Sequence, residues 1–554
     1  MQIPSLKRMD RNARRLTEIF AVLGKYGLAD WLGGLRIDWL QRQLVSFDGE
    51  RLSNVSHEAR IRLALIELGT TFIKFGQVLS TRADLVGAEL ASEMSQLRSN
   101  TPPDSVTAVK SMIQAELGKP VEELFAEFEE KAFASASIGQ VHRAKLHDGQ
   151  VVVVKVQHTG IEEKIASDLE IMAFLADFIQ KHVSQFRPYQ PLAVVREFRR
   201  TILKELDFAC ERRNLEEFTR NFADNATVHF PITYPDLSSQ RVLTMEMLTG
   251  TSFENAAGLR QAGVDLNEIV CRGVNAYLEM IFTNGFYHAD PHPGNLILLP
   301  DGVIGIIDGG MIGRVDDHLR EEIECMLLGV IHKDPQEVTD VVVRLGSPPP
   351  DLDIEGLRSD LNEFNLEYGS RALRDFNVGE ALNDITDIIH RYRVFLPAGC
   401  SLLLKTLVML EGTSHQLNPS FSLAELIQPY EEKSLQRRFS TSKLWGKMSR
   451  AYRDWDRLME QMPRDLSVIL QHMRSGNYEI KHEHRRLETT VNHLVMGLLI
   501  AALFLGSTEL WSRGIPPTLH DVSIPGVLGY FLALVLGFRL FRRIVRMESK
   551  SGEP

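Results

Sequence analysis

The spacing of apolar residues changes several times along the chain. Helical spacing over 63–97 and over Ser105–Leu117 predicts two N-terminal helices, the second closed by Gly118. Strand-like composition follows over 132–144 and 151–156, with a turn sequence between the two runs. The further expected elements are helices over 161–222, a strand at 241–245, a helix at 266–284, strands at 296–299 and 303–307, and helices over 317–478.

Two uncharged apolar segments lie near the C-terminus. Residues 489–508 form a run of 20 residues without formal charge, and 522–538 form a run of 17. At about 1.5 Å per residue, each is at the short end of what crosses a bilayer core of about 30 Å. The pattern favours a transmembrane helical hairpin, and a buried helix pair in a soluble protein is the alternative.

Basic residues flank these two segments on their outer sides. By the positive-inside rule, both flanks and the large N-terminal body lie on the cytoplasmic side of the bacterial inner membrane, and the basic flanks favour anionic lipid. The flanking residues are Lys481, Arg485, Arg486, Arg539, Arg542, Arg543 and Arg546.

Composition excludes several broad classes of protein. The net charge of −11 and pI near 5.9 argue against a general nucleic-acid binder, which needs a basic surface. The mean hydropathy of −0.11 excludes a polytopic transporter. Four widely separated cysteines without CxxC spacing argue against a zinc site. Residues 1–22 are basic but lack a continuous apolar stretch, so they do not form a signal peptide.

The most informative segment for chemistry runs from His288 to Asn295. Asp290 and Asn295 lie five residues apart on a loop rich in proline and glycine, and Asp308 follows the next strand–turn–strand unit. Phosphoryl transfer uses one carboxylate beside the acceptor, and an amide with a second carboxylate that hold Mg²⁺ against nucleotide phosphates. The spacing therefore predicts a MgATP-type site.

A lysine in an apolar strand fits the same chemistry. Lys155 stands alone in Val151-Val-Val-Val-Lys-Val156, where an unpaired charge is costly. We expect a glutamate on a following helix to pair with it, and Glu211 is the candidate, although composition alone does not choose it over Glu170.

The segment before this strand is the expected phosphate-covering loop. It lacks the usual G-x-G-x-x-G pattern, but its small residues permit close approach of backbone to phosphate, and two serines could add hydroxyl donors. The loop residues are Ala134, Ser135, Ala136, Ser137, Ile138, Gly139, Gln140 and Val141.

These motifs together resemble the UbiB-like atypical kinases over about residues 61–330. Residues 68–85 match the KxGQ helix of that family, with Lys74, Gly76 and Gln77 at its named positions. Glu205-Leu-Asp207 matches the ExD motif, and residues 134–137 match the alanine-rich loop.

The resemblance implies a role for each matching residue. Lys155 would contact phosphate with Glu211 as its ion-pair partner, Asp290 would be the catalytic aspartate, and Asn295 and Asp308 would be metal ligands. The KxGQ helix would lie across the site where a protein substrate docks, with the ExD carboxylates nearby. A buried Lys74 would need a carboxylate, which Glu205 or Asp207 can supply.

Three positions depart from the patterns expected of such kinases. Ser135 replaces an alanine of the loop, Gly309 replaces the phenylalanine that follows the metal-binding aspartate, and His292 stands where many protein kinases have a lysine near the transferred phosphate.

The expected fold is α+β, a two-lobed protein-kinase-like body with a helical N-terminal extension and the C-terminal hairpin. We expect an N-terminal extension at 1–118, an N-lobe at 119–245 and a helical C-lobe with extension at 246–480. The two transmembrane helices would occupy 489–541.

The resemblance implies a membrane-anchored kinase or ATPase that binds ATP and Mg²⁺ and supports ubiquinone biosynthesis. Membrane lipid, polyprenyl-phenol or quinone intermediates and ubiquinone-biosynthetic enzymes would be its partners. The alternatives are a small-molecule phosphotransferase resembling aminoglycoside or choline kinases, and a nucleotide-binding pseudokinase scaffold. A monooxygenase finds no support, because no flavin, haem or iron motif is evident.

Overall fold

The computed structural model of the chain contains two compact units, residues 1–440 and 441–554, which are described separately. The structure describes residues 6–28, 55–98, 101–183, 186–255, 258–259, 265–331, 334–349, 351–369, 377–419, 421–427, 487–513, 516–519 and 522–548.

An antiparallel sheet of five strands carries the first part of the site. Its strand order is β1-β3-β4-β6, and β2 also pairs with β3. The β3–β4 hairpin confirms the predicted turn at Asp148-Gly149, where Gly149 has φ +92° and Gln150 N donates to Asp148 Oδ1. The strands are β1 Glu127–Phe128, β2 Ala134–Ser135, β3 Gly139–Lys145, β4 Val151–Gln157 and β6 Val242–Glu246.

Alternation along β4 decides which way Lys155 faces. Successive side chains of a strand point to opposite faces. Val152, Val154 and Val156 belong to a small apolar cluster with α8 (Val106–Leu117) and α9 (Val121–Leu124). Lys155 therefore lies on the other face, toward the larger core.

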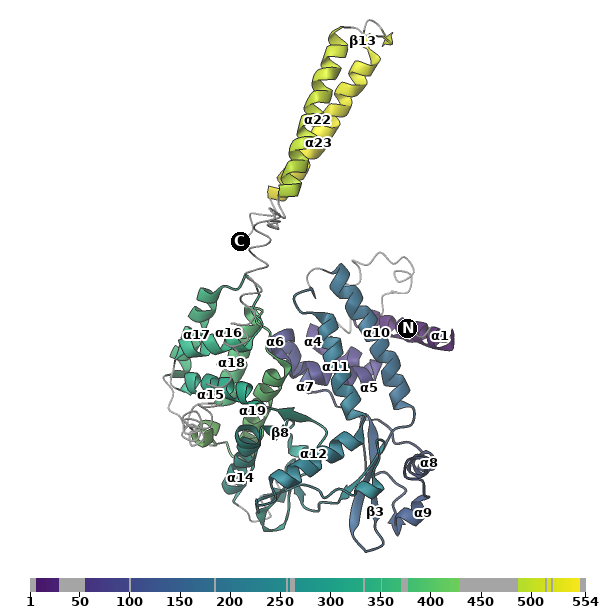
Figure 1. Cartoon of the computed structure of the whole chain (residues 1–554), viewed down its shortest axis with the longest axis vertical. Coiled ribbons are helices and arrows are strands. Elements are labelled where there is room, and N and C mark those ends of the chain that lie inside the picture. The colour runs from purple at the N-terminus through teal and green to yellow at the C-terminus, as the bar shows by residue number, and fades with distance from the viewer. Residues whose placement is uncertain are drawn as a thin grey trace, which may run out of the picture. The chain divides into compact units, whose positions relative to one another are not determined.

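Three long helices cover that second face or continue from it. They are α10 (Ile161–His182), α11 (Pro191–Glu205) and α12 (Phe208–Asn221). Helices α10 and α11 pack side by side (Figure 1). Asp207 separates α11 from α12 and caps α12 by accepting a hydrogen bond from Ala209 N. The cap places the start of α12 beside β4.

The predicted helix over 63–97 is wrong as a single element. Gly69 and Gly87 divide the region, and they have φ of +91° and +83°, a backbone conformation that only glycine adopts without strain. The helices of this region are α1 Leu6–Lys25, α4 His57–Leu68, α5 Thr70–Leu79, α6 Ala83–Val86 and α7 Ala88–Ser95.

The C-terminal part of the first unit contains small sheets and a set of helices. β8 pairs with β11, and β10 lies between β5 and β9. The strands are β5 Val228–His229, β7 Thr251–Ser252, β8 Phe286–His288, β9 Leu296–Leu298, β10 Ile304–Ile306 and β11 Ile312–Arg314. The helices are α14 Leu266–Leu278, a π-helical turn Glu279–Asn284, α15 Asp317–Ile331, α16 Pro335–Leu345, α17 Ile354–Gly369, α18 Val378–Arg391 and α19 Ala398–Leu417. Short 3₁₀ turns span Pro235–Leu237, Pro293–Asn295 and Pro300–Gly302.

The second unit contains α22 (Leu487–Ser512) and α23 (Ile524–Glu548), which lie side by side and are joined through β12 (Thr518–Leu519) and β13 (Val522–Ser523) (Figure 1). Within the described residues, one helix is long and apolar enough to cross a membrane, over Val495–Ser512. The apolar part of α23, Ile524–Leu540, is shorter.

Helices were predicted over 317–478. The part of this stretch beyond residue 427 lies outside the described residues.

Gly76 offers a stability test of the KxGQ helix. A Cβ at Gly76 would lie 2.2 Å from Leu97 Cδ1 and 2.9 Å from Leu65 Cδ1. We expect Gly76→Ala to lower the free energy of unfolding by about 1–3 kcal/mol, because this packed site has no room for a methyl group. Gly412→Ala in α19 is the matched control. It meets no atom within 4 Å and should raise stability by about 0.5–1 kcal/mol. Thermal melts of the purified chain would measure both, and equal effects would contradict the packing argument.

Candidate functional site

The ion pair at Lys155 is the structural centre of the site. Lys155 Nζ lies 2.9 and 2.8 Å from the two carboxylate oxygens of Glu211, which is buried on α12. The ammonium also stands 5.1 Å from the ring centroid of Phe208. Glu170, the alternative partner, is exposed on α10. The structure therefore joins β4 to α12 through Lys155 and Glu211.

Asp308 completes this cluster of charges, in which Glu211 is buried and Lys155 and Asp308 are partly exposed. Burial would lower the pKa of Lys155, but Glu211 and Asp308 raise it above the usual value. Burial raises the pKa of Glu211 to about 7, with Asp308 acting in the same direction. For Asp308, burial opposes ionisation, yet Lys155 and His288 lower its pKa to about 2. Asp308 is thus a carboxylate at neutral pH and is available to a cation.

The predicted pair at the catalytic loop also meets in space. Asn295 Nδ2 donates to Asp290 Oδ2 over 3.0 Å and to the Asp290 carbonyl over 3.2 Å. The loop leaves β8 at His288, which is buried and hydrogen-bonded to Tyr277 at 3.0 Å. Burial lowers the pKa of His288, although Asp308 and Asp290 oppose the shift.

The donor set fits Mg²⁺. The amide nitrogen of Asn295 is used by Asp290, which leaves its Oδ1 without a partner among the described residues. Asp308 Oδ1 accepts from Gly310 N over 3.0 Å, and its carboxyl group also interacts with that of Glu211. Hard oxygen ligands of this kind suit Mg²⁺, which keeps waters and phosphates in its other positions. No group of three or more His, Cys, Asp or Glu residues converges among the described residues.

Close packing explains why Asp308 is followed by glycine. A Cβ at Gly309 would lie 2.8 Å from Leu215 Cγ and 3.2 Å from the Glu211 carbonyl. The Gly309 carbonyl also accepts a hydrogen bond from Asn214 Nδ2 over 2.9 Å. Helix α12 therefore packs directly on this loop, and a phenylalanine has no space there.

Only part of the predicted phosphate-covering loop faces Lys155. Val141 is its cross-strand neighbour and lies on the same face. Gln140 lies on the opposite face, where its amide binds Asp104 N and His142, so its side chain is directed away from Lys155. Position 139 requires glycine because the backbone of β4 approaches it closely. A Cβ there would lie 2.6 Å from the Val156 carbonyl oxygen.

The predicted hydroxyl donors of this loop are also not free. Ser135 Oγ donates to the Thr101 carbonyl over 2.7 Å, and Ser137 is buried. His158 supports the turn through the Ala136 carbonyl, 3.0 Å from its Nε2, and its own backbone N–H donates to the Ile138 carbonyl. The loop can offer backbone to a phosphate, and sequence reasoning did not identify His158 as its support.

The KxGQ helix, α5, contacts the site through its charged residue. Lys74 Nζ lies 2.6 Å from Glu205 Oε1 at the end of α11. Of the two ExD carboxylates, Glu205 is therefore the partner, whereas Asp207 caps α12. Glu205 also contributes to raising the pKa of Lys155. Gln77 donates to the Leu97 carbonyl over 2.8 Å, which holds α5 against the segment that follows α7.

Helix α19 contributes contacts that sequence reasoning missed. Thr413 Oγ1 donates to the Pro291 carbonyl over 3.0 Å, and Thr406 Oγ1 lies 3.3 Å from the Ala289 carbonyl while it donates to the Leu402 carbonyl of its own helix over 2.8 Å. Asp290 lies between these two anchored residues. Lys405 precedes Thr406 in the apolar run Leu402-Leu-Leu-Lys-Thr-Leu-Val, and the signal that identified Lys155, a lone lysine among apolar residues, was present here too.

A buried ion pair joins the region after α5 to the helical C-terminal part. Arg82 lies 3.0 Å from Asp84, and the Asp84 carboxylate accepts from Leu396 N and Ser401 Oγ, each over 3.1 Å. This contact fastens the segment after the KxGQ helix to α19.

Models of known protein families match three parts of the chain. The ABC1 atypical kinase-like domain matches residues 96–342, the UbiB helical domain matches 361–422, and the ABC1/UbiB kinase-like C-terminal domain matches 479–546.

Individual relatives span most of the chain. A probable protein kinase UbiB from Marinobacter nauticus is 32% identical over 426 residues, which is 76% of this chain and 78% of that protein. An uncharacterized protein in the hydrogenase 1 5′ region of Clostridium pasteurianum is 28% identical over 539 residues, 96% and 98% of the two chains. A Mycobacterium tuberculosis protein, solved in complex with erythromycin, aligns with a TM-score of 0.39 at 23% identity, covering 58% of this chain and 84% of that one.

Proposed function

Because the chain belongs to the ABC1/UbiB family of atypical kinase-like proteins, as its motifs predicted, we propose that it is a membrane-anchored enzyme that binds MgATP and acts as a phosphotransferase or ATPase. One observation carries this proposal. Lys155, Glu211 and Asp308 form a coupled charge cluster, and the Asp290–Asn295 pair lies on the neighbouring loop. Kinase-type chemistry needs all of these groups.

Each residue has a defined task in this proposal. Lys155, positioned by Glu211, neutralises phosphate charge, and Val141 covers the nucleotide from the sheet. Asn295 Oδ1 and Asp308 would hold Mg²⁺, and the bound ion would neutralise charge on the phosphates. Asp290 accepts the proton of the attacking hydroxyl or water. The bond from the terminal phosphorus to its leaving oxygen then breaks as the new bond forms.

The Lys74–Glu205 pair supports a small or membrane-embedded acceptor rather than a protein. The pair ties α5 to the end of α11, next to the charges around Lys155. We propose that α5 restricts access for a protein substrate and serves a regulatory role together with Gly76, Gln77 and Asp207.

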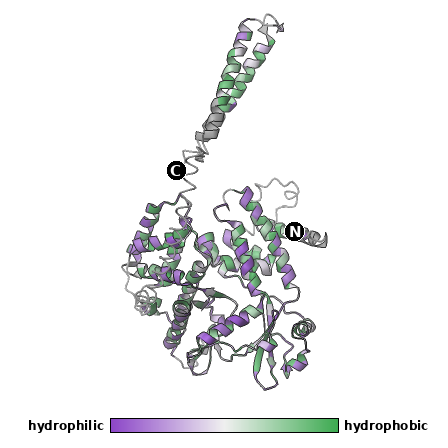
Figure 2. Cartoon of the chain, viewed as in Figure 1, coloured by the Kyte–Doolittle hydropathy of each residue, from purple (hydrophilic) through white to green (hydrophobic). Residues whose placement is uncertain are grey.

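The membrane part of the proposal depends on the C-terminal helices. Only 6% of the Val495–Ser512 window is buried, so this helix differs from the buried core helix of a soluble protein. Figure 2 shows that hydrophobic residues extend along both α22 and α23. We propose that the pair inserts into the bacterial inner membrane, with the kinase-like body on the cytoplasmic side.

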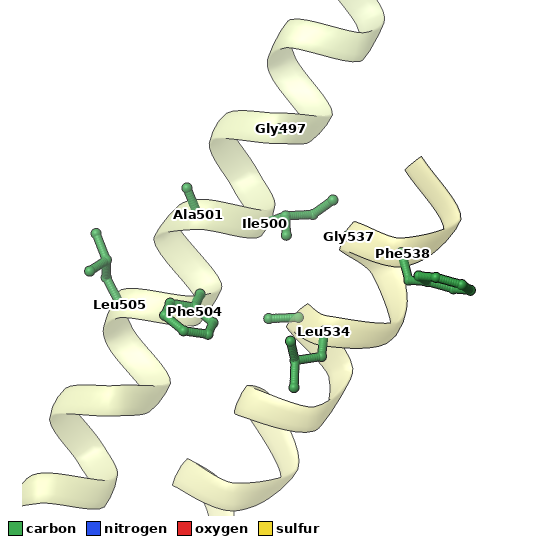
Figure 3. Close-up of a pocket in the computed structure, with 9 residues that line it drawn as sticks. Gly497, Ile500, Ala501, Phe504, Leu505, Leu534, Gly537 and Phe538 are labelled. Atoms are coloured by element: carbon green, nitrogen blue, oxygen red, sulfur yellow. The ribbon is translucent and has the colours of Figure 1, made fainter. Parts of the chain in front are cut away.

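An apolar groove between the two helices is consistent with lipid contact. It has a volume of about 660 Å³ and is lined by side chains such as Ile500, Phe504, Leu534 and Phe538 (Figure 3). In a bilayer, lipid tails fill such a groove. Membrane location also suits a role in ubiquinone biosynthesis, in which polyprenyl intermediates reside in the bilayer, and we propose these intermediates or their enzymes as partners.

The proposal is tested with the full chain and a variant ending at residue 486. We expect the full chain to co-sediment with anionic phospholipid vesicles and to release phosphate from MgATP faster on vesicles that contain phenolic quinone precursors. The variant without α22 and α23 should stay in the supernatant and show no vesicle stimulation, because the apolar surface is removed.

Other outcomes would redirect the assignment. Vesicle-independent phosphorylation of a sugar or amino alcohol would indicate a small-molecule phosphotransferase, and MgATP binding without turnover would indicate a scaffold. A shortened chain that still binds vesicles would move the attachment site to the N-terminal part, around 31–44, which lies outside the described residues.

A further inference from the structure

The catalytic loop contains no cation of its own. Residues 288–295 include neither lysine nor arginine. His292, at the position where many protein kinases have a lysine, is used locally: its Nδ1 accepts from Gly294 N over 3.0 Å, and its Nε2 lies 3.5 Å from Arg98. The ring shapes the turn before Asn295. A lysine or arginine that contacts the transferred phosphate, in addition to Lys155, would therefore come from another element.

Helix α19 positions a lysine, Lys405, beside the catalytic loop. The hydrogen bond from Thr413 to the Pro291 carbonyl, and the 3.3 Å contact of Thr406 Oγ1 with the Ala289 carbonyl, hold α19 against the residues on both sides of Asp290. Lys405 adjoins Thr406, and the charge of Asp290 acts on it. Among the described residues, Lys405 Nζ donates a hydrogen bond to Ser80 Oγ over 2.7 Å, at the C-terminal end of α5.

Lys405 differs from the other site cations in its partners. Lys155 is paired with Glu211, and Lys74 with Glu205, whereas no carboxylate of the described residues lies within ion-pair distance of Lys405. Burial lowers the pKa of Lys405 to about 8, and Asp290 opposes the shift. A partly buried ammonium that is held only by a hydroxyl is costly, and an incoming anion would relieve that cost.

We propose that Lys405 contacts the terminal phosphate of the bound nucleotide and supplies the positive charge that the catalytic loop lacks. Its ammonium exchanges the Ser80 hydroxyl for a phosphate oxygen when a nucleoside triphosphate binds. A nucleoside diphosphate leaves the contact with Ser80 in place. This inference rests on the proposed nucleotide-binding function.

The test compares two nucleotides on the full chain. Binding of MgADP and of the non-hydrolysable Mg-AMP-PNP is measured by calorimetry. Lys405→Met should weaken AMP-PNP binding by ~10-fold or more, the value of one charge-assisted hydrogen bond, and leave MgADP within about 2-fold. Lys405→Arg keeps the charge and should retain most of the AMP-PNP affinity. Retained AMP-PNP affinity in Lys405→Arg would also show that the fold tolerates a substitution at position 405.

Ser80→Ala separates phosphate contact from a structural latch. It removes the partner of Lys405 in the nucleotide-free state and should leave both affinities within about 2-fold. Equal affinities of wild type and Lys405→Met for AMP-PNP, parallel losses for both nucleotides, or a Ser80→Ala loss as large as that of Lys405→Met would each overturn the inference. A wild-type chain that binds neither nucleotide would instead overturn the proposed function itself.

Discussion

Replacing Asp308 by asparagine should abolish Mg²⁺-dependent nucleotide binding, with a loss of MgATP affinity of ~100-fold or more. The carboxylate is ionised at neutral pH because Lys155 and His288 lower its pKa to about 2 against the effect of burial. An amide at this position keeps the shape but removes the charged oxygen ligand that Mg²⁺ prefers. Calorimetric titration with MgATP, compared with ATP in the presence of EDTA, measures the metal-dependent part.

Asp301→Asn provides a matched control for this experiment. Asp301 is exposed in the turn before β10, and its φ of +60° is one that asparagine tolerates. The control makes the same chemical change on the same hairpin and should leave MgATP affinity unchanged. Unaltered affinity in Asp308→Asn would exclude this residue as a metal ligand.

Replacing Asp290 by asparagine should lower ATP turnover by ~10³-fold while MgATP affinity changes only a few-fold. The substitution removes the proton acceptor, and general-base contributions are typically of order 10²–10⁴. The Asn295 amide, which donates to Asp290 Oδ2 over 3.0 Å, can still donate to the new side-chain oxygen, so the loop keeps its form. Phosphate release and equilibrium binding are measured on the same preparation.

Asp334→Asn serves as the control for Asp290. Asp334 caps α16 through Gln336 N and Glu337 N, and asparagine caps helices equally well. Its turnover should match wild type. Full activity of Asp290→Asn would mean that another group activates the acceptor, and a parallel loss of MgATP binding would assign Asp290 to the metal instead.

Much of the site was predictable because its signals are local. The spacing from Asp290 to Asn295 and the hairpin before Asp308 place three functional groups on adjacent turns of one short segment. Likewise, alternation along β4 put Lys155 on a defined face. Helix ends followed the same logic, since Ser105 and Gly118 bound α8 as expected.

Errors arose where packing overrode local preference. The helix expected over 63–97 is broken at Gly69 and Gly87, whose left-handed backbone lets α4, α5 and α7 pack on one another. The hydroxyl of Ser135, predicted as a donor to phosphate, already donates to the Thr101 carbonyl, and the amide of Gln140 binds Asp104 N. Small polar residues satisfy the nearest partner, and composition does not show which partner that is.

The sequence by itself determined the family, the strand-borne Lys155, the Asp–Asn–Asp set and the apolar C-terminal segments. Each of these features follows from residues that lie close together in the sequence. Only the tertiary structure decided that Glu211 rather than Glu170 meets Lys155, that Glu205 rather than Asp207 meets Lys74, and that Lys405 stands beside the catalytic loop. The pairs Lys155–Glu211, Lys74–Glu205 and Lys405–Ser80 are 56, 131 and 325 positions apart, and packing of whole helices, not local spacing, brings them together.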